Sequence, residues 1–292
     1  MIKRIGITAL LVVLVVSTLG SVPSEASFRR SPCRGTRPPR QWNHVVWIVM
    51  ENHSYDEIIG SNAAPYINRL AGKCGLAANF HAITHPSLPN YIAMTSGRTH
   101  GIADDQAPSA HRLRGKSIFS QLHGDWRSLE ESMPSRCALS SSGTYAVKHN
   151  PAAYYIRIRP ACRRRDVPYH LGGRLNISAR FTFVTPNLCN DMHDCSVATG
   201  DAWLKRFMAK LLRKRRYQRG RTAVFITFDE ALDGSAGNHI PTIVVAPSVH
   251  PGKRSAARFT LYSLLRTTES MLNLSRLSRA AHARGMRGRF NL

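Results

Sequence analysis

Acidic side chains are scarce in this chain of 292 residues, which has 17 Asp and Glu against 41 Lys and Arg and a formal net charge of +24. Such a surface attracts anions, whether phosphorylated small molecules, acidic lipid headgroups or nucleic acid. Because arginine content can also follow the codon bias of a genome, the charge indicates an anionic partner without choosing one.

Long apolar runs are also missing, apart from IGITALLVVLVV near the N-terminus. The basic start MIKR precedes this run, and the small, polar stretch STLGSVPSEAS follows it. This order is typical of a secretory signal, and the run is shorter than the roughly 20 residues that a membrane span needs. We expect a signal peptide over 1–26, a Pro/Arg-rich lead-in over 27–43, and one domain over 44–292 in a secreted protein. An uncleaved anchor or a lipid anchor is the alternative.

Cysteine is limited to six residues, and these lack the paired CxxC spacing of a zinc cluster. In a secreted chain such cysteines indicate disulfides, although sequence alone cannot fix which residues pair. Cys189 and Cys195 enclose the short loop NDMHD, so we pair them. We pair the remaining four as Cys137 with Cys162 and Cys33 with Cys74.

Four strongly apolar, β-branched runs alternate with helix-like segments. The runs are HVVWIVM at 44–50, FTFVT at 181–185, TAVFITF at 222–228 and TIVVAPS at 242–248. They are hydrophobic throughout, as the buried strands of a parallel sheet are. Amphipathic segments at 64–72, 202–217 and 262–274 predict helices. The alternation predicts an α/β fold, with a mostly parallel sheet sandwiched by helices.

Polar side chains lie next to the ends of these predicted strands. Glu51 and Asn52 follow the first strand, Asp191 and His193 come soon after the second, Asp229 and Glu230 follow the third, and His239 precedes the fourth. Sites in such sheets lie beyond the carboxyl ends of the strands. Mixed carboxylate and imidazole ligands suit Mn, Fe or Zn, and oxygen ligands alone suit Mg or Ca. Any one of these residues could simply begin a turn, but together they favour a site for a divalent metal ion.

The stretch ITHPSLPNYIAMTSG at 83–97 places Ser87 between Pro86 and Pro89, ahead of an apolar run. The prolines would fix the turn, and the run would start a helix whose N-terminus favours a bound phosphate. A metal ion beside the serine would lower the pKa of its hydroxyl and make it a nucleophile. Ser87 therefore needs no Ser-His-Asp relay. His85, two positions earlier, either tunes the pocket or packs.

Five stretches in this order resemble the bacterial phosphoesterase family, which includes secreted acid phosphatases and phospholipase C enzymes of the alkaline-phosphatase superfamily. They are ENHSYDEIIG, THPSLPNYIAMTSG, NDMHDCSVATGDAWL, FDE and NHIPTIVVAPSVHPG, and the likeness runs from about residue 44 to the C-terminus. The resemblance implies an alkaline-phosphatase-like fold. It also implies that Ser87, in its SLPN setting with Asn90, is the nucleophile.

The resemblance further assigns candidate metal ligands and substrate contacts. The metal candidates are Glu51 and Asn52 as a first pair, Asp229 and Glu230 as a second acidic pair, Asp191 and His193, and His239 as the late histidine of the superfamily. The superfamily has a DxxxH pair where this chain has DxH, and Asn187, four residues before Asp191, would restore the register. The substrate-binding candidates are Asn90, Asn187, Lys148 and His149, of which His149 could instead protonate the leaving oxygen.

We therefore expect a metal-dependent phosphoesterase that hydrolyses phosphomonoesters through a phosphoseryl intermediate, with one divalent metal ion and a second left open. Its ligand would be an anionic phosphorylated small molecule or a lipid headgroup such as a phosphoinositide. We expect a monomer with no stable nucleic acid partner. The basic stretch at 205–221 has an apolar stripe that favours packing on the sheet.

Two other functions remain open at this point. A phosphodiesterase of the phospholipase C type would keep the same nucleophile but would need a pocket that admits a second ester group. A non-catalytic, basic anion-binding protein on a phosphatase scaffold would bind phosphate analogues without turnover.

Overall fold

The computed structural model describes residues 2, 31–232 and 235–292, and Ser31–Leu292 form one unit. Apart from residue 2, the predicted signal peptide lies outside the described residues. From Ser31 onward the lead-in has no helix or strand. Cys33 attaches it to Cys74 through a disulfide, and two of its backbone N–H groups donate to Pro247 O. Among the described residues, no helix is both long and apolar enough to cross a membrane.

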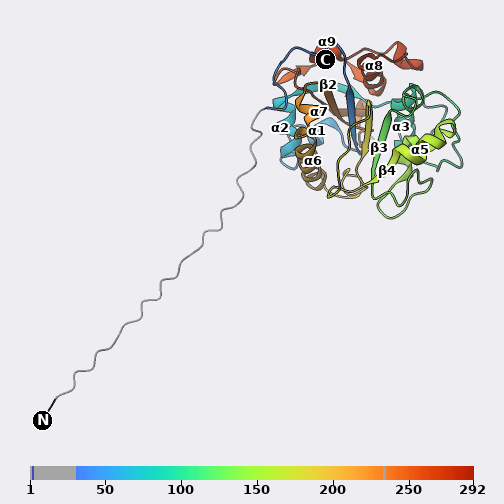
Figure 1. Ribbon diagram of the computed structural model, residues 1–292, viewed down its shortest axis with the longest axis horizontal. Helices are drawn as coiled ribbons and strands as arrows, with labels where there is room; N and C mark the ends of the chain where they lie inside the picture. The colour runs from blue at the N-terminus through green and yellow to red at the C-terminus, as the bar shows by residue number, and fades with distance from the viewer. Residues whose placement is uncertain (1, 3–30, 233–234) are drawn as a thin grey trace. The chain divides into compact units, whose positions relative to one another are not determined.

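Within the described residues, nine strands form one mixed sheet, in the order β4-β3-β5-β1-β6-β7-β2-β8 with β9 also paired to β2 (Figure 1). The strands are β1 His44–Met50, β2 Gly75–His81, β3 Trp126–Glu131, β4 Asp166–Tyr169, β5 Phe181–Thr185, β6 Thr222–Phe228, β7 His239–Val245, β8 Lys253–Ser255 and β9 Phe259–Thr260. β7 runs antiparallel to β6 and to β2, and the other pairs are parallel. The predicted mostly parallel sheet is confirmed.

Nine α-helices lie within the described residues and flank this sheet. They are α1 Tyr55–Ile58, α2 Pro65–Lys73, α3 Ser87–Ser96, α4 Ile118–Gln121, α5 Arg159–Arg165, α6 Val197–Leu212, α7 Arg215–Gln218, α8 Leu261–Met271 and α9 Arg287–Phe290. Figure 1 shows α6 and α7 at the left of the view and α3 and α5 at the right. The apolar stripe of α6 is buried, including Trp203 and Phe207, whose rings stack with centroids 5.0 Å apart and planes 14° from parallel.

The disulfides fix three loops of this unit. All six cysteines lie within the described residues and are bonded as Cys33–Cys74, Cys137–Cys162 and Cys189–Cys195, which are the pairs chosen from the sequence. Three disulfides indicate a chain that folds in an oxidising, extracellular or secretory compartment.

Candidate active site

The carboxyl ends of four parallel strands meet at one edge of the sheet, and each is followed by polar residues. Glu51 comes directly after β1 and Asp229 directly after β6, while Asp191 lies in the loop after β5. The Glu51 N–H donates to Asp191 O, and the Asp229 N–H donates to Met50 O, so these ends are joined by backbone hydrogen bonds. β2 points to the same edge, because it is antiparallel to β7, and the chain then leads to Ser87.

Ser87 is the first residue of α3 and is only 1% exposed. Its Oγ lies 3.2 Å from Glu51 Oε2 and 3.2 Å from Glu230 Oε1. A hydroxyl has one proton to donate, so it can serve only one of these oxygens at a time. Two carboxylates therefore converge on the side chain that the sequence marks as the nucleophile.

The carboxyl groups of Glu51, Asp191 and Asp229 are buried together. Burial, and next the charge of Asp229, raises the pKa of Glu51 well above its usual range. Burial, with a further contribution from Asp229, does the same to the pKa of Asp191, and burial raises the pKa of Asp229 to about 7. Such a cluster is costly when it is ionised without a counter-charge. A divalent cation among these oxygens would supply that charge.

The carboxamide of Asn52 offers a direct test of whether the cluster fits a cation. Its Oδ1 faces Glu230 Oε1 at 3.1 Å and Glu51 Oε2 at 3.3 Å, which places three oxygens against one another. Turning the amide over would let its nitrogen donate to both carboxylates. With a cation between them, the three oxygens would instead be ligands as they stand. The donor set of Glu51, Asn52, Asp229 and Glu230 therefore fits a divalent metal ion.

Imidazole groups adjoin the same cluster from the other side of Glu51. One ligand atom each of Glu51, His149 and His193 lie within 4.8 Å of one another. His149 Nε2 is 3.2 Å from Glu51 Oε1, and Nδ1 is 3.5 Å from Asp191 Oδ2. Burial lowers the pKa of His149 well below its usual range, which favours the neutral ring that binds metals. The sequence predicted that His149 binds substrate phosphate or protonates the leaving oxygen, and its position beside Glu51 and Asp191 also suits a metal ligand.

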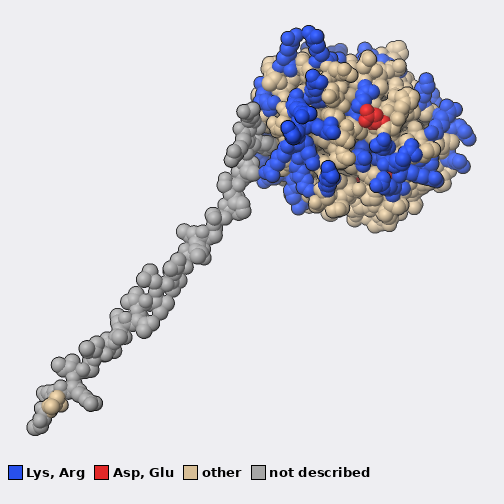
Figure 2. Space-filling view, in the orientation of Figure 1, with Lys and Arg blue, Asp and Glu red and all other residues tan. Residues whose placement is uncertain are grey.

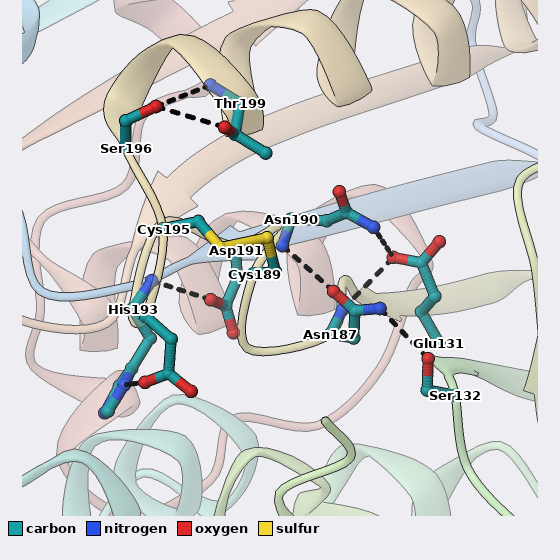
Figure 3. Close-up of a disulfide and its surroundings, with 11 residues drawn as sticks. Glu131, Ser132, Asn187, Cys189, Asn190, Asp191, His193, Cys195, Ser196 and Thr199 are labelled. Atoms are coloured by element: carbon teal, nitrogen blue, oxygen red, sulfur yellow. Dashed lines mark hydrogen bonds and ion pairs between the residues drawn. A yellow bond between two sulfur atoms is a disulfide. The ribbon is translucent and has the colours of Figure 1, made fainter. Parts of the chain in front are cut away.

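The loop that carries Asp191 and His193 is closed by the Cys189–Cys195 disulfide (Figure 3). Asp191 Oδ1 accepts the His193 N–H at 2.8 Å, and His193 Nδ1 contacts Asp194 Oδ1. Asn187, predicted to bind substrate, is committed to the frame of this loop. Its Oδ1 accepts the Asn190 N–H and its Nδ2 donates to Ser132 Oγ.

The frame of the loop also rests on Glu131, at the end of β3. Glu131 Oε2 accepts the Asn187 N–H and an N–H of the Asn190 amide, as Figure 3 shows. Glu131 Oε1 accepts the indole N–H of Trp203 at 3.0 Å. Sequence analysis missed this residue, because WRSLEE does not have the continuous apolar pattern of the four predicted strands.

The described contacts of His239, another candidate metal ligand, are not with the carboxylate cluster. Its ring stacks on Tyr55 with centroids 4.4 Å apart and lies 5.1 Å from the ring of His81. Its Nε2 is 3.1 Å from Ala78 O. His239 begins β7 at the correct edge of the sheet, but these contacts engage its ring with neighbouring β2 and α1.

Two residues predicted to bind substrate, Asn90 and Lys148, make hydrogen bonds close to Ser87. Asn90 Oδ1 accepts the N–H groups of Ile83 and Thr84, and its Nδ2 donates to Glu230 Oε2 at 3.2 Å. The Lys148 ammonium donates to Asp105 Oδ2 at 2.9 Å. Asp105 also accepts the Leu88 N–H at 2.9 Å. Both side chains therefore hold the turn that presents Ser87.

Tyr91 is a further residue of the site that sequence analysis missed. Its hydroxyl donates to Glu51 Oε1 at 2.5 Å, and its ring stacks on His149 with centroids 5.2 Å apart. Tyr91 follows Ser87 by four residues in α3, so the two side chains lie on one face of the helix. That spacing was the available signal.

The comparison with known families follows from this geometry. Residues 61–275 match the model of the Phosphoesterase family. The chain belongs to this family. It is a hydrolase that acts on phosphoric ester bonds.

Named relatives of this phosphoesterase include bacterial and fungal phosphatases. It is 33% identical over 248 residues to the phosphatidylinositol-3-phosphatase of Mycobacterium tuberculosis, with 82% of this chain and 80% of the other covered. It is 29% identical over 230 residues to the phosphate-repressible acid phosphatase of Penicillium chrysogenum, with 73% of this chain and 55% of the other covered. The chain thus spans little more than half the length of the fungal relative.

A solved structure of the alkaline phosphatase superfamily from Vibrio parahaemolyticus has the same fold. It superposes with a TM-score of 0.58 at 10% sequence identity, covering 85% of this chain and 71% of the other. At this identity the likeness concerns the fold alone, and it agrees with the predicted alkaline-phosphatase-like architecture.

Proposed function

We propose that this phosphoesterase hydrolyses phosphomonoesters through a phosphoseryl intermediate on Ser87. The observation that carries the proposal is the convergence of Glu51 and Glu230 oxygens on Ser87 Oγ, each at 3.2 Å, within a buried carboxylate cluster. A divalent ion held by this cluster would lower the pKa of the serine hydroxyl and offset charge on the phosphoryl oxygens.

Residues of the chain and water together account for each proton and bond. Ser87 Oγ forms a bond to phosphorus as the bond from phosphorus to the leaving alcohol oxygen breaks, and its proton passes to the Glu51 or Glu230 carboxylate. The leaving oxygen takes a proton from water. The hydroxide left by that water attacks the phosphorus of the phosphoserine as the bond from phosphorus to Ser87 Oγ breaks. Phosphate is released, and Ser87 Oγ takes back the proton held by the Glu51 or Glu230 carboxyl group.

We propose that His149, His193 and Asp191 bind a second metal ion. The distances that join the two rings to Glu51 support it, as does the burial of His149, which lowers its pKa and so favours the neutral ring. Lys148 and Asn90 would position the turn around Ser87, because each is hydrogen-bonded to that turn or its neighbours. His239 would act on the site only through its contacts with β2.

The names of the relatives favour monoesters as substrates. The mycobacterial relative is a phosphatidylinositol-3-phosphatase, and the fungal relatives are acid phosphatases. We propose an anionic phosphorylated small molecule or lipid headgroup as substrate, which the net charge of +24 would attract. The predicted signal peptide and the three disulfides support a secreted protein, which we expect to be a monomer.

Ser87→Ala tests the proposal. The variant loses one buried oxygen and its bonds to two carboxylates, so we expect a folded protein whose monoester turnover falls at least about a thousandfold. Phosphate release is measured on a panel of monoesters and a matched panel of diesters. Ser96→Ala is the control, since it makes the same change at the buried far end of α3.

Each result of this assay has a distinct meaning. Monoester turnover that survives Ser87→Ala would overturn the mechanism. Diester turnover alone would assign the chain to the phospholipase C type. Binding of phosphate analogues without turnover, in a folded and metal-loaded sample, would assign it to the non-catalytic alternative. Wild-type enzyme quenched in acid during turnover should carry phosphate on Ser87, detected by mass spectrometry.

A further inference from the structure

A second concave site lies among basic residues that the phosphoesterase site does not use. The cavity has a volume of about 580 Å³, within the range of small-molecule pockets. None of the residues that line the cavity is Asp or Glu. Five of them carry a positive charge: Arg98, Arg112, Arg114, Lys116 and Arg276. His100 and Ser96 complete the polar lining.

The cavity is separate from the nucleophile. Ser96, which lines it, is the last residue of α3, whereas Ser87 is the first. With a rise of 1.5 Å per residue, these ends of the helix are about 14 Å apart. An anion in this cavity would therefore lie at the opposite end of α3 from the reacting hydroxyl.

Helix ends explain only part of the basic lining. Arg98 follows the C-terminus of α3, and Arg276 follows α8 and donates from Nη1 to Leu274 O, so both suit the negative end of a helix dipole. Arg112, Arg114 and Lys116 come from a segment outside any helix. These three exposed cations line one cavity and do not lie at the C-terminal end of a helix.

Neighbouring carboxylates do not balance this charge. Within the described residues, no ion pair joins any of the five cations to an Asp or Glu. Glu269 is the acid whose charge acts on Arg276, and its own Oε1 accepts the Leu277 N–H. The wall is also closely packed, since a Cβ on Gly115 would lie 2.5 Å from the ring of His100. The cationic side chains are therefore gathered around a formed space.

We propose that this cavity binds an anion that carries two or more phosphate groups. A single phosphate monoester has a charge of about −1.5 to −2 at neutral pH, which would leave about three of the five positive charges unbalanced. Arginine side chains bind phosphate oxygens in pairs of charge-assisted hydrogen bonds, and four of the five cations are arginines. Such an anion could be free in solution or could be the headgroup of a polyphosphorylated lipid.

Binding of myo-inositol hexasulfate to the full chain tests the site. This probe is multiply anionic and is a sulfate ester, so it is not the phosphomonoester substrate that we propose for the serine site. The pocket variant carries Arg112→Gln, Arg114→Gln and Lys116→Gln, all at exposed side chains. The control carries Arg213→Gln, Arg215→Gln and Arg219→Gln, also exposed, next to or within α7. Both remove three positive charges, and Figure 1 places α7 and α3 on different sides of the view.

Calorimetric titration should show that the pocket variant binds the probe at least about tenfold more weakly. The control variant should change by less than about twofold. Equal losses in both variants would mean that the whole basic surface binds polyanions diffusely, and this would overturn the proposal. Unchanged binding in the pocket variant would overturn it as well. Single Arg112→Gln and Arg114→Gln variants replace the triple variant if its melting curve shows that it does not fold.

Vesicles identify the source of the anion. Sedimentation is compared between vesicles containing a phosphatidylinositol bisphosphate and vesicles of equal charge containing phosphatidylserine. Binding to the first alone, lost in the pocket variant, would assign a lipid headgroup to the cavity. Pocket-dependent binding of the soluble probe without vesicle binding would assign a free polyphosphorylated anion. Phosphomonoester turnover at low substrate concentration, measured in parallel, should be retained in the pocket variant, which keeps this site independent of the proposed mechanism.

Discussion

Several side chains of this phosphoesterase surround the hydroxyl of Ser87 and the carboxylate of Glu51. Glu51 is the centre of that arrangement, because Ser87, Tyr91 and His149 all contact its carboxylate. Each of its two oxygens has a different neighbour: Oε2 faces the serine, and Oε1 faces the tyrosine and the histidine. The orientation of the Glu51 carboxylate therefore determines its contact with Ser87, and it would also determine whether the same group can bind a metal ion.

Tyr91→Phe should lower kcat for a phosphomonoester about tenfold with little change in KM. The substitution keeps the ring that stacks on His149 but removes the bond to Glu51 Oε1, and a hydrogen bond to a charged group is worth about 1.5–3 kcal/mol. Steady-state kinetics across a range of metal concentrations measure the effect. Tyr155→Phe is the matched control, since its hydroxyl bonds Thr95 in the same helix. Wild-type kcat in Tyr91→Phe would contradict a positioning role.

The sequence supplies candidate residues at this scale, but it does not predict the neighbours that their side chains contact. Ser87, Glu51 and Asp229 could be chosen because each residue follows a strand or occupies a distinctive turn. The stacking of His239 on Tyr55 could not be foreseen, because it depends on side-chain rotamers and on the antiparallel entry of β7. The hydrogen bonds of Asn187 with Asn190, Ser132 and Glu131 could not be predicted for the same reason.

Secondary-structure elements show where the hydrophobic pattern is sufficient. The predicted ranges of β1, β5 and β6 match those observed, because these strands lie inside the sheet and every residue in them is buried. β2 and β3 escaped prediction, since GLAANFH and WRSLEE mix polar residues into their runs. The predicted helix at 202–217 is two helices, α6 and α7, with Arg213 and Lys214 between them.

The loop after β5 is the element on which a second metal ion would depend. The Cys189–Cys195 disulfide closes it, with a sequence separation of 6. Replacing both cysteines by serine should lower the free energy of unfolding by about 2 kcal/mol and weaken the binding of metal by Asp191 and His193. Thermal melting and metal titration measure the two effects.

The matched control for this loop is the Cys33–Cys74 pair, which attaches the lead-in and has a sequence separation of 41. Replacing that pair by serine should also lower the melting temperature, but metal affinity should stay within about twofold of the wild type. Equal loss of metal affinity in the two double variants would show that the effect comes from general destabilisation.

Charge is distributed very unevenly over the whole molecule. Figure 2 shows Lys and Arg in several groups over one face, with little Asp or Glu exposed there. Several of the few carboxyl groups are instead buried, among them Glu130, Asp166 and Glu269, which lie outside the phosphoesterase site. Burial raises the pKa of each of them above its usual range. The fold should therefore gain stability when these groups are protonated.

Glu269 lies outside the phosphoesterase site, so the effect of its protonation on stability can be measured separately from any metal binding. Burial raises its pKa from 4.5 to about 7 in the folded chain. Between these pH values the folded chain retains a proton that the unfolded chain has lost, so stability falls as the pH rises, by at most about 1.4 kcal/mol per pH unit. Glu269→Gln keeps an oxygen to accept the Leu277 N–H but cannot ionise. The variant should match the wild type near pH 4.5 and exceed it at pH 7.5 by on the order of 1–3 kcal/mol.

Urea unfolding of both proteins at several pH values measures this difference in the free energy of unfolding. Asp56→Asn is the control, because it removes an acid of the same charge from an exposed position in α1. Its pH profile should run parallel to that of the wild type, while the profile of Glu269→Gln should be flatter. Parallel profiles for all three proteins would mean that Glu269 titrates alike in the folded and unfolded chains. The stability of the molecule in acid would then have to come from Glu130 and Asp166, which lie in the neighbouring strands β3 and β4, where the charge of Asp166 adds to burial in raising the pKa of Glu130.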